Sequence, residues 1–330
     1  MQIVVLGMHR SGTSALVRLL SLAGCWIGTD DDFHAADDAN PRGYWEHKEV
    51  WGLDSDLLTA LGGDWDELPD FDLDRLDSAA REVFASRARE IVARLDAQAV
   101  AVPSKAWAIK DPRLCLTLPL WQPALPRAVA VFALRSPLSI ARSIARRDGY
   151  ALAVGLALWE QHLRAALTAT AETPRVAIHF ENLLDSPHEE LVGLVERLRA
   201  LGVPLHDPDP AAVAFLDRTL ERERREPDLE PQLLSNEQLA LRDALRDGTA
   251  LVAGRDGGTL SPLAVYDVGD DDLQRILDDL LTPNAARRAA NLGKLRTELE
   301  AWHPDPSARD LPALEEEVAA SDDDDDDDDD

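Results

Sequence analysis

Apolar residues occur along the first 200 residues in two alternating patterns. Short uninterrupted runs predict strands buried on both faces, because a strand covered by helices on both sides carries no polar side. These runs are 3–6, 106–109 and 128–134, and a fourth strand is predicted at 175–181. Since helices are predicted between the strands, we expect a parallel sheet with right-handed crossovers. The pattern therefore predicts an α/β fold.

The second pattern, apolar positions at helical spacing, predicts the flanking helices. They cover residues 15–20, 47–61, 79–95, 137–145, 152–170 and 187–200. We expect residues 1–225 to form the core, and residues 226–302 to form a mostly helical C-terminal cap of the same domain. Residues 303–330 are rich in Pro and Asp and end in nine aspartates, which favours a disordered acidic tail.

Charge and composition narrow the classes of protein that fit. The formal net charge is −28, and the chain without its nine terminal aspartates still carries −19. A field of that sign disfavours binding to nucleic acid and to anionic membranes, so an anionic ligand needs a local basic cluster. Two cysteines, Cys25 and Cys115, stand far apart and predict buried thiols instead of a disulfide framework. Without a leader or an apolar run long enough to span a membrane, we predict a soluble, cytoplasmic protein.

The first predicted strand leads into a glycine-bounded loop, which predicts an anion-binding site. Gly7, Met8, His9, Arg10, Ser11, Gly12, Thr13 and Ser14 follow the strand and open a helix. Two glycines five residues apart let successive N–H groups face one concavity, and the helix start adds its positive end. This is the spacing of a phosphate-binding loop, although Thr13 replaces its lysine and the cation is Arg10.

Two further cations end predicted strands. Lys110 follows the second strand and Arg135 follows the third. The carboxyl ends of parallel strands share one edge of the sheet, where open α/β proteins bind ligands. We therefore expect both side chains near the Gly7–Ser14 loop, within a sheet of the P-loop type.

A second motif begins at Arg135, with Pro137 next and Ser143 eight residues after the arginine. With the segment from Arg10 to Ser14, this spacing resembles that of sulfotransferases that use 3′-phosphoadenosine 5′-phosphosulfate (PAPS). Shorter segments, residues 40–46 among them, resemble bacterial carbohydrate-type sulfotransferases. The resemblance covers about residues 2–200 and implies that Arg135 and Ser143 bind the 3′-phosphate. A guanidinium fork and a hydroxyl suit a phosphate dianion.

The resemblance also implies the catalytic roles. Arg10 and the loop amides would stabilise the leaving 5′-phosphate, so that 3′,5′-adenosine bisphosphate is released and no metal is needed. Glu46 is the first choice for the base that deprotonates the acceptor, with His47 second and His9 third. Lys110 is expected to contact the sulfate or the phosphate.

Two other functions stay open on the residues alone. A P-loop kinase would need a lysine at Thr13 and a magnesium-binding aspartate, for which Asp111 is the nearest candidate. A non-catalytic nucleotide-binding protein would keep the donor site without turnover. The expected acceptor is a hydroxyl of a glycan, glycolipid or small metabolite. The sequence does not indicate the oligomeric state.

Overall fold

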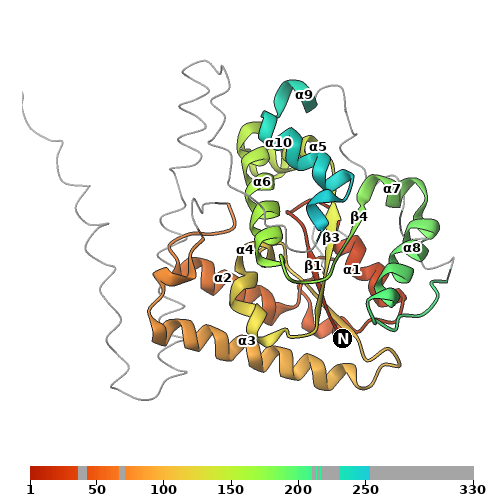
Figure 1. Cartoon of the computed structure of the whole chain (residues 1–330). Coiled ribbons are helices and arrows are strands. Elements are labelled where there is room, and N and C mark those ends of the chain that lie inside the picture. Colours follow the sequence, from red (N-terminus) through yellow and green to blue (C-terminus); the bar gives the residue numbers. More distant parts are fainter. Residues whose placement is uncertain (36–42, 67–70, 210–212, 214–215, 217–229, 253–330) are drawn as a thin grey trace, which may run out of the picture. The chain divides into compact units, whose positions relative to one another are not determined.

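The computed structural model describes residues 1–35, 43–66, 71–209, 213, 216 and 230–252 (Figure 1). The boundary expected near residue 225, most of the predicted C-terminal cap and the acidic tail lie outside the described residues. Part of the segment 40–46 lies outside them as well. No helix in the described ranges is long and apolar enough to cross a bilayer.

The centre of the fold is the predicted parallel sheet. Its strands are β1 (Gln2–Leu6), β2 (Trp107–Lys110), β3 (Ala128–Leu134) and β4 (Arg175–His179), in the order β2-β1-β3-β4. Every pairing between neighbouring strands is parallel. The α/β prediction is confirmed, and Lys110, expected directly after the second strand, is its last residue.

The register of the sheet sets which loops become neighbours. The chain leaves β1 toward β2 on one side and returns through β3 on the other, so the strand order reverses between β1 and β3. Such a switch point is where open α/β sheets bind ligands. Leu6 pairs with Phe132, and Leu134 pairs with His179. The loops that follow β1, β3 and β4 therefore start at one edge, side by side.

Helices cover both faces of the sheet. Figure 1 shows α1, α7 and α8 on one side, and α4, α5 and α6 on the other. Ser136 begins α5 by accepting a hydrogen bond from Ser139 N–H, with Pro137 as its first residue. The bounds are α1 (Thr13–Leu22), α2 (Lys48–Ala60), α3 (Ser78–Ala99), α4 (Leu114–Trp121), α5 (Pro137–Asp148), α6 (Leu152–Ala169), α7 (Phe180–Asp185), α8 (Pro187–Ala200), α9 (Glu230–Leu233) and α10 (Asn236–Arg246).

The core explains why the strands are apolar throughout. Ile3 and Val5 of β1 pack in one cluster with side chains of α1 and α8. Val4 and Leu6 point to the opposite face and are equally buried. The sheet is thus covered on both sides, which leaves the edge where the strands end as the expected place for a ligand.

One prediction about the elements needs correction. The fourth strand was expected to run to residue 181, but it ends at His179, and Phe180 and Glu181 begin α7. These two side chains turn toward the loops after β1 and β3, as described below. Within the predicted C-terminal cap, Glu230–Leu233 and Asn236–Arg246 form the helices α9 and α10, and α9 packs against α5.

Candidate active site

The Gly7–Ser14 loop connects β1 to α1, as its sequence predicts, and its anion-binding role stays a prediction. Gly7 N–H donates to Cys115 Sγ (3.2 Å), and Ser11 N–H donates to Met8 C=O (3.1 Å). The ladder of α1 starts with the bond from Leu16 N–H to Gly12 C=O, so the N–H groups of residues 13–15 precede it. They form the positive end of the helix, which attracts anions.

Backbone conformation and packing limit which residues can occupy positions in this loop. Gly12 has φ 93°, and a Cβ there would lie 2.4 Å from a ring carbon of Phe180. Arg10 adopts φ 70°, which is rare outside glycine and tends to occur at functional sites. The Ser11 hydroxyl is buried and has no hydrogen-bond partner in the described part of the chain. A bound anion would supply that partner.

Arg10 connects the Gly7–Ser14 loop to the second motif, which runs from Arg135 to Ser143. Its Nε donates to Ser143 Oγ (2.9 Å), and its backbone carbonyl accepts from Arg135 Nη1 (2.9 Å). Arg10 follows β1, Arg135 follows β3 and Ser143 belongs to α5, and although up to 133 positions separate them, they meet at the switch point. The structure therefore assembles the two guanidinium groups and the hydroxyl into one basic cluster.

The start of α7 completes this cluster, and the sequence analysis assigns it no role. The Arg135 guanidinium lies over the Phe180 ring, 4.9 Å from its centroid. Glu181 Oε1 accepts a hydrogen bond from Ser136 N–H (2.8 Å). Phe180 also packs on Gly12, so this short segment contacts both the Gly7–Ser14 loop and Arg135 of the second motif. The signal that could have identified it is its place directly after a strand at the binding edge.

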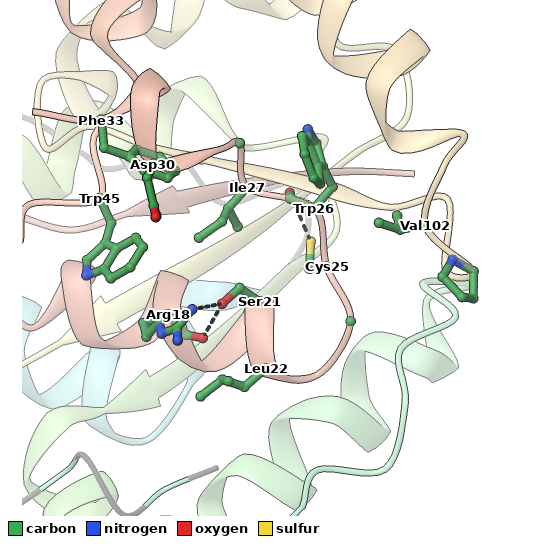
Figure 2. A pocket seen from close by; sticks show the side chains of 13 residues that line it. Arg18, Ser21, Leu22, Cys25, Trp26, Ile27, Asp30, Phe33, Trp45 and Val102 are labelled. Atoms are coloured by element: carbon green, nitrogen blue, oxygen red, sulfur yellow. Dashed lines mark hydrogen bonds between the residues drawn. The ribbon is translucent and has the colours of Figure 1, made fainter.

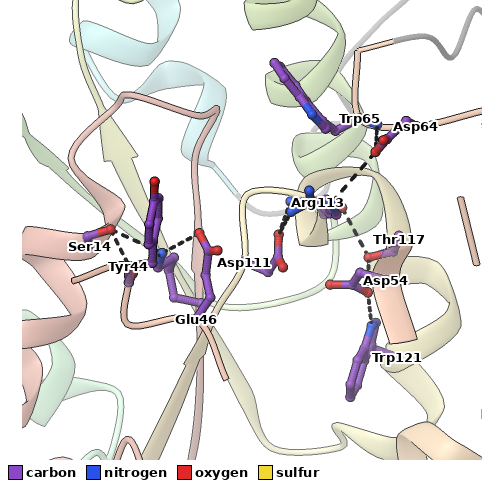
Figure 3. Close-up of polar contacts among 11 residues, drawn as sticks. Ser14, Tyr44, Glu46, Asp54, Asp64, Trp65, Asp111, Arg113, Thr117 and Trp121 are labelled. Carbon is purple, nitrogen blue, oxygen red and sulfur yellow. Dashed lines mark hydrogen bonds and ion pairs between the residues drawn. The ribbon is translucent and has the colours of Figure 1, made fainter. Parts of the chain in front are cut away.

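Lys110 lies on the other side of the loop and is almost fully buried. Its Nζ donates to Glu46 Oε1 (2.7 Å), to the Tyr44 carbonyl (2.5 Å) and to Ser14 Oγ (3.2 Å) (Figure 3). The Ser14 hydroxyl also donates to the Tyr44 carbonyl (2.9 Å). These three acceptors match the three donors of an ammonium group. Lys110 thereby ties Glu46 to the start of α1, and its expected contact with the transferred group stays a prediction.

Asp111, the candidate for a magnesium ligand, belongs to a buried structural cluster (Figure 3). Its Oδ1 accepts from Arg113 N–H (2.8 Å) and from Arg113 Nη1 (3.2 Å). Asp54 accepts from Thr117 (2.7 Å) and from the indole of Trp121 (2.8 Å). Burial raises the pKa of both carboxyl groups, and Asp111 raises that of Asp54 further. The cluster holds α2, α4 and the end of β2 together.

The two histidines proposed as alternative bases differ in position. His47 precedes α2, with its ring nitrogens 3.8 Å from an Asp32 oxygen and 3.9 Å from a Glu49 oxygen. Burial lowers its pKa, against the opposing effect of Asp32. His9 lies in the loop, packed on Trp65 with ring centroids 4.2 Å apart. Burial and the charge of Arg113 hold the pKa of His9 well below its usual range, so its ring is neutral.

A cavity of about 310 Å³ lies beside the C-terminal half of α1 and the segment that follows it (Figure 2). The Arg18 guanidinium lies over the Trp45 ring (4.9 Å), and Phe33 packs edge-on against the same ring (5.4 Å). None of the predicted site residues lines this cavity. Its residues are Arg18, Ser21, Leu22, Gly24, Cys25, Trp26, Ile27, Gly28, Asp30, Phe33, Trp45, Val102 and Pro103.

The structure thus brings most of the predicted residues to one edge of the sheet. Glu46 and Lys110 lie on one side of the Gly7–Ser14 loop, and Arg135 and Ser143 lie on the other. His47 points instead to two carboxylates outside this group. Within the described residues, no group of three or more His, Cys, Asp or Glu side chains is arranged to hold a metal ion. The absence of a metal from the reaction remains a prediction.

The first two thirds of the chain are similar to a known family. The model of the Sulfotransferase family matches residues 2–207. No curated protein shows a significant match to the chain. Among solved structures, the sulfotransferase domain from the curacin biosynthetic pathway aligns with 89% of this chain and 96% of its own, at 15% identity and a TM-score of 0.37. The family match includes the Gly7–Ser14 loop, Lys110 and the Arg135–Ser143 motif, and it ends before α9.

Proposed function

This chain belongs to the sulfotransferase family, and on that premise we propose that it moves a sulfuryl group from PAPS to an acceptor hydroxyl. The observation that carries the choice of donor is the bond between Arg10 and Ser143, together with that from Arg135 to the Arg10 carbonyl. In a P-loop that binds ATP, the cation that contacts the phosphates belongs to the loop itself. Here Arg10 of the loop instead contacts Arg135 and Ser143 of a second motif. A second phosphate on the nucleotide would account for that basic cluster.

The residues at the edge fit such a donor. The Ser11 hydroxyl lacks a partner, and the N–H groups at the start of α1 precede the helical ladder, so both can bind a 5′-phosphate. Arg135 and Ser143 supply a planar fork and a hydroxyl for the 3′-phosphate. The donor contributes an activated sulfuryl group. Arg10, between the two positions, would stabilise the negative charge that develops on the leaving phosphate.

Sulfuryl transfer requires a base as well. The bond from sulfur to the 5′-phosphate oxygen breaks, a bond from sulfur to the acceptor oxygen forms, and the acceptor proton must be removed. We assign Glu46 to this step, because Lys110 holds its carboxylate beside Ser14 of the loop. His47 is directed at Asp32 and Glu49 instead. The acceptor, a hydroxyl of a glycan, glycolipid or small metabolite, is proposed from the resemblance alone.

The kinase alternative has less support. Thr13 stands where a kinase loop has its lysine, and Asp111 is fully buried with one carboxylate oxygen bound to Arg113. Its burial and its ion pair with Arg113 disfavour a role as a magnesium ligand. A non-catalytic nucleotide-binding protein would retain the same donor cluster, so turnover must decide between it and the enzyme.

Calorimetry with three nucleotides tests the donor. We expect 3′,5′-adenosine bisphosphate to bind more tightly than adenosine 5′-monophosphate, and Arg135→Ala to remove that difference. Magnesium-dependent ATP binding that survives Arg135→Ala would instead indicate a kinase. Transfer of ³⁵S from labelled PAPS to a panel of hydroxyl acceptors then tests the reaction. Donor binding without transfer to any acceptor, and without an effect of Glu46→Gln, would favour the non-catalytic alternative.

A further inference from the structure

Glu230 is a buried carboxylate outside the residues that match the family. It contacts Ser136, the residue next to Arg135 of the basic cluster. It is the first residue of α9 and is only 2% exposed. Its Oε1 accepts from Ser136 Oγ (2.5 Å), and its Oε2 accepts from Arg242 Nη1 of α10 (2.9 Å). A carboxylate at this depth needs such partners, because burying it unpaired would be very costly.

Ser136 occupies the turn between Arg135 and α5, and its hydroxyl both donates and accepts a hydrogen bond. Its hydroxyl oxygen accepts from Ser139 N–H (3.2 Å), as a helix cap does. The hydroxyl hydrogen is therefore left for Glu230, and a carboxylate is a strong acceptor for it. The Ser136 N–H donates to Glu181. Two carboxylates, one from α7 and one from α9, thus fix this single residue.

The position of Ser136 governs the two residues proposed to hold the 3′-phosphate. Arg135 precedes it directly, and Ser143 lies two turns into the helix that Ser136 caps. A shift of the turn would change the direction of the Arg135 guanidinium and move α5 with its hydroxyl. Such groups must be held closely in place if two donors are to meet one dianion.

We propose that Glu230 is a positioning residue for the donor site, which makes α9 and α10 part of that site. It holds the Ser136 turn so that Arg135 and Ser143 converge on the 3′-phosphate, and Arg242 neutralises it. This inference rests on the proposed function, since it assigns these two residues to the 3′-phosphate. It gives the region beyond residue 207 a role that the family match does not supply.

Glu230→Gln tests the proposal, with Glu237→Gln as the matched control. Glu237 is an exposed acid in the first turn of α10, so its substitution changes the charge equally without touching the turn. We expect Glu230→Gln to weaken binding of 3′,5′-adenosine bisphosphate about tenfold. Binding of adenosine 5′-monophosphate should stay unchanged. In turnover, KM for PAPS should rise while kcat is preserved.

The selectivity between the two nucleotides separates positioning from a structural role. An equal loss for both nucleotides, or no loss for either, would overturn the proposal. If Glu230→Gln does not fold, Glu230→Asp keeps the negative charge and shortens the reach to both Ser136 and Arg242. It should show the same selective loss to a smaller degree, and equal effects on both nucleotides would again refute the role. Failure of the wild type to prefer the bisphosphate would instead refute the proposed function.

Discussion

Arg10 combines a strained backbone with a central place among the basic residues. Its φ of 70° costs about 1–2 kcal/mol for a side chain other than glycine. That conformation places its carbonyl on Arg135 and its side chain on Ser143. Strain of this kind persists where surrounding structure enforces it and where function uses it. Arg10 is thus the first residue to substitute.

Arg10→Ala should remove transfer and leave the fold intact. We expect kcat/KM to fall by at least about 100-fold, the usual effect of removing a group that stabilises developing charge. The bond from Arg135 uses the backbone carbonyl of Arg10 and survives the substitution. Arg89→Ala, which removes an exposed cation paired with Glu82 on α3, is the control. Transfer assays and circular dichroism measure the two effects, and undiminished turnover would mean that the leaving group lies elsewhere.

Glu46→Gln separates proton removal from donor binding. The amide oxygen of Gln can still accept from Lys110, so the contact with the loop is retained, but the side chain no longer takes up a proton. We expect kcat to fall about 100-fold or more while affinity for 3′,5′-adenosine bisphosphate is unchanged. His47→Asn is the control for the second candidate base. A loss of kcat in that variant alone would identify His47 as the base.

At the scale of elements, the loop after β1 and the start of α7 form one unit. Gly12 and Phe180 approach so closely that no side chain fits between them. Phe180 in turn lies beneath the Arg135 guanidinium. The packing of α7 on the loop therefore contributes to the shape of the proposed donor site, although neither Phe180 nor Gly12 carries charge.

Gly12→Ala should destabilise the protein more than Gly62→Ala. Both glycines have positive φ, 93° and 83°, so both substitutions pay the backbone cost of about 1–2 kcal/mol. Only Gly12 adds a clash with Phe180, since nothing lies within 4 Å of a Cβ at Gly62. Overpacking of that kind costs about 1–3 kcal/mol more. Denaturant unfolding of the two variants measures the difference, and equal losses would show that Phe180 gives way.

The sequence predicts those elements whose signal is local. β3 is an uninterrupted apolar run, and α5 has Pro137 at its first position, so both were predicted closely. The end of β4 was not, because Phe180 reads as a strand residue in isolation. It turns away from the sheet to fill the space above Gly12, and that space exists only once β1, β3 and β4 are in register.

The same reasoning applies to the site. Motif spacing identified Arg10, Arg135 and Ser143, and the structure brings them together. The sequence does not predict that Lys110 binds the Tyr44 carbonyl, because every residue has a backbone carbonyl whatever its side chain. Glu230 lies 94 positions from Ser136 and in no motif, so only the folded chain reveals their contact.

At the scale of the whole molecule, buried titratable groups tie stability to pH in opposite directions. His162 of α6 is fully buried, and its Nδ1 bonds to the Leu158 carbonyl (2.8 Å). Burial lowers the pKa of His162 to about 4, and the charge of Arg113 acts in the same direction. Asp54 and Asp111 have raised pKa values, so the folded state holds protons there that the unfolded chain releases. These carboxyls favour folding as the pH falls, whereas His162 opposes it.

His162→Asn isolates one side of this balance. Between pH 6.5 and about 4 the unfolded chain binds a proton at His162 that the folded state excludes, so this residue makes stability fall with the pH. The full contribution across that window is about 3 kcal/mol. Asn keeps a donor for the Leu158 carbonyl but does not titrate, so the variant should lose less stability on acidification than the wild type.

Denaturant unfolding at pH 7 and pH 4.5 measures that difference, with His188→Asn on α8 as the matched control. The stability gap between wild type and His162→Asn should narrow as the pH falls, because the wild type alone loses the contribution of its neutral imidazole. The carboxyls of Asp54 and Asp111 are common to both proteins and cancel in the comparison. A gap that stays constant would mean that His162 keeps an ordinary pKa in the fold, and that water or a neighbouring group reaches its ring.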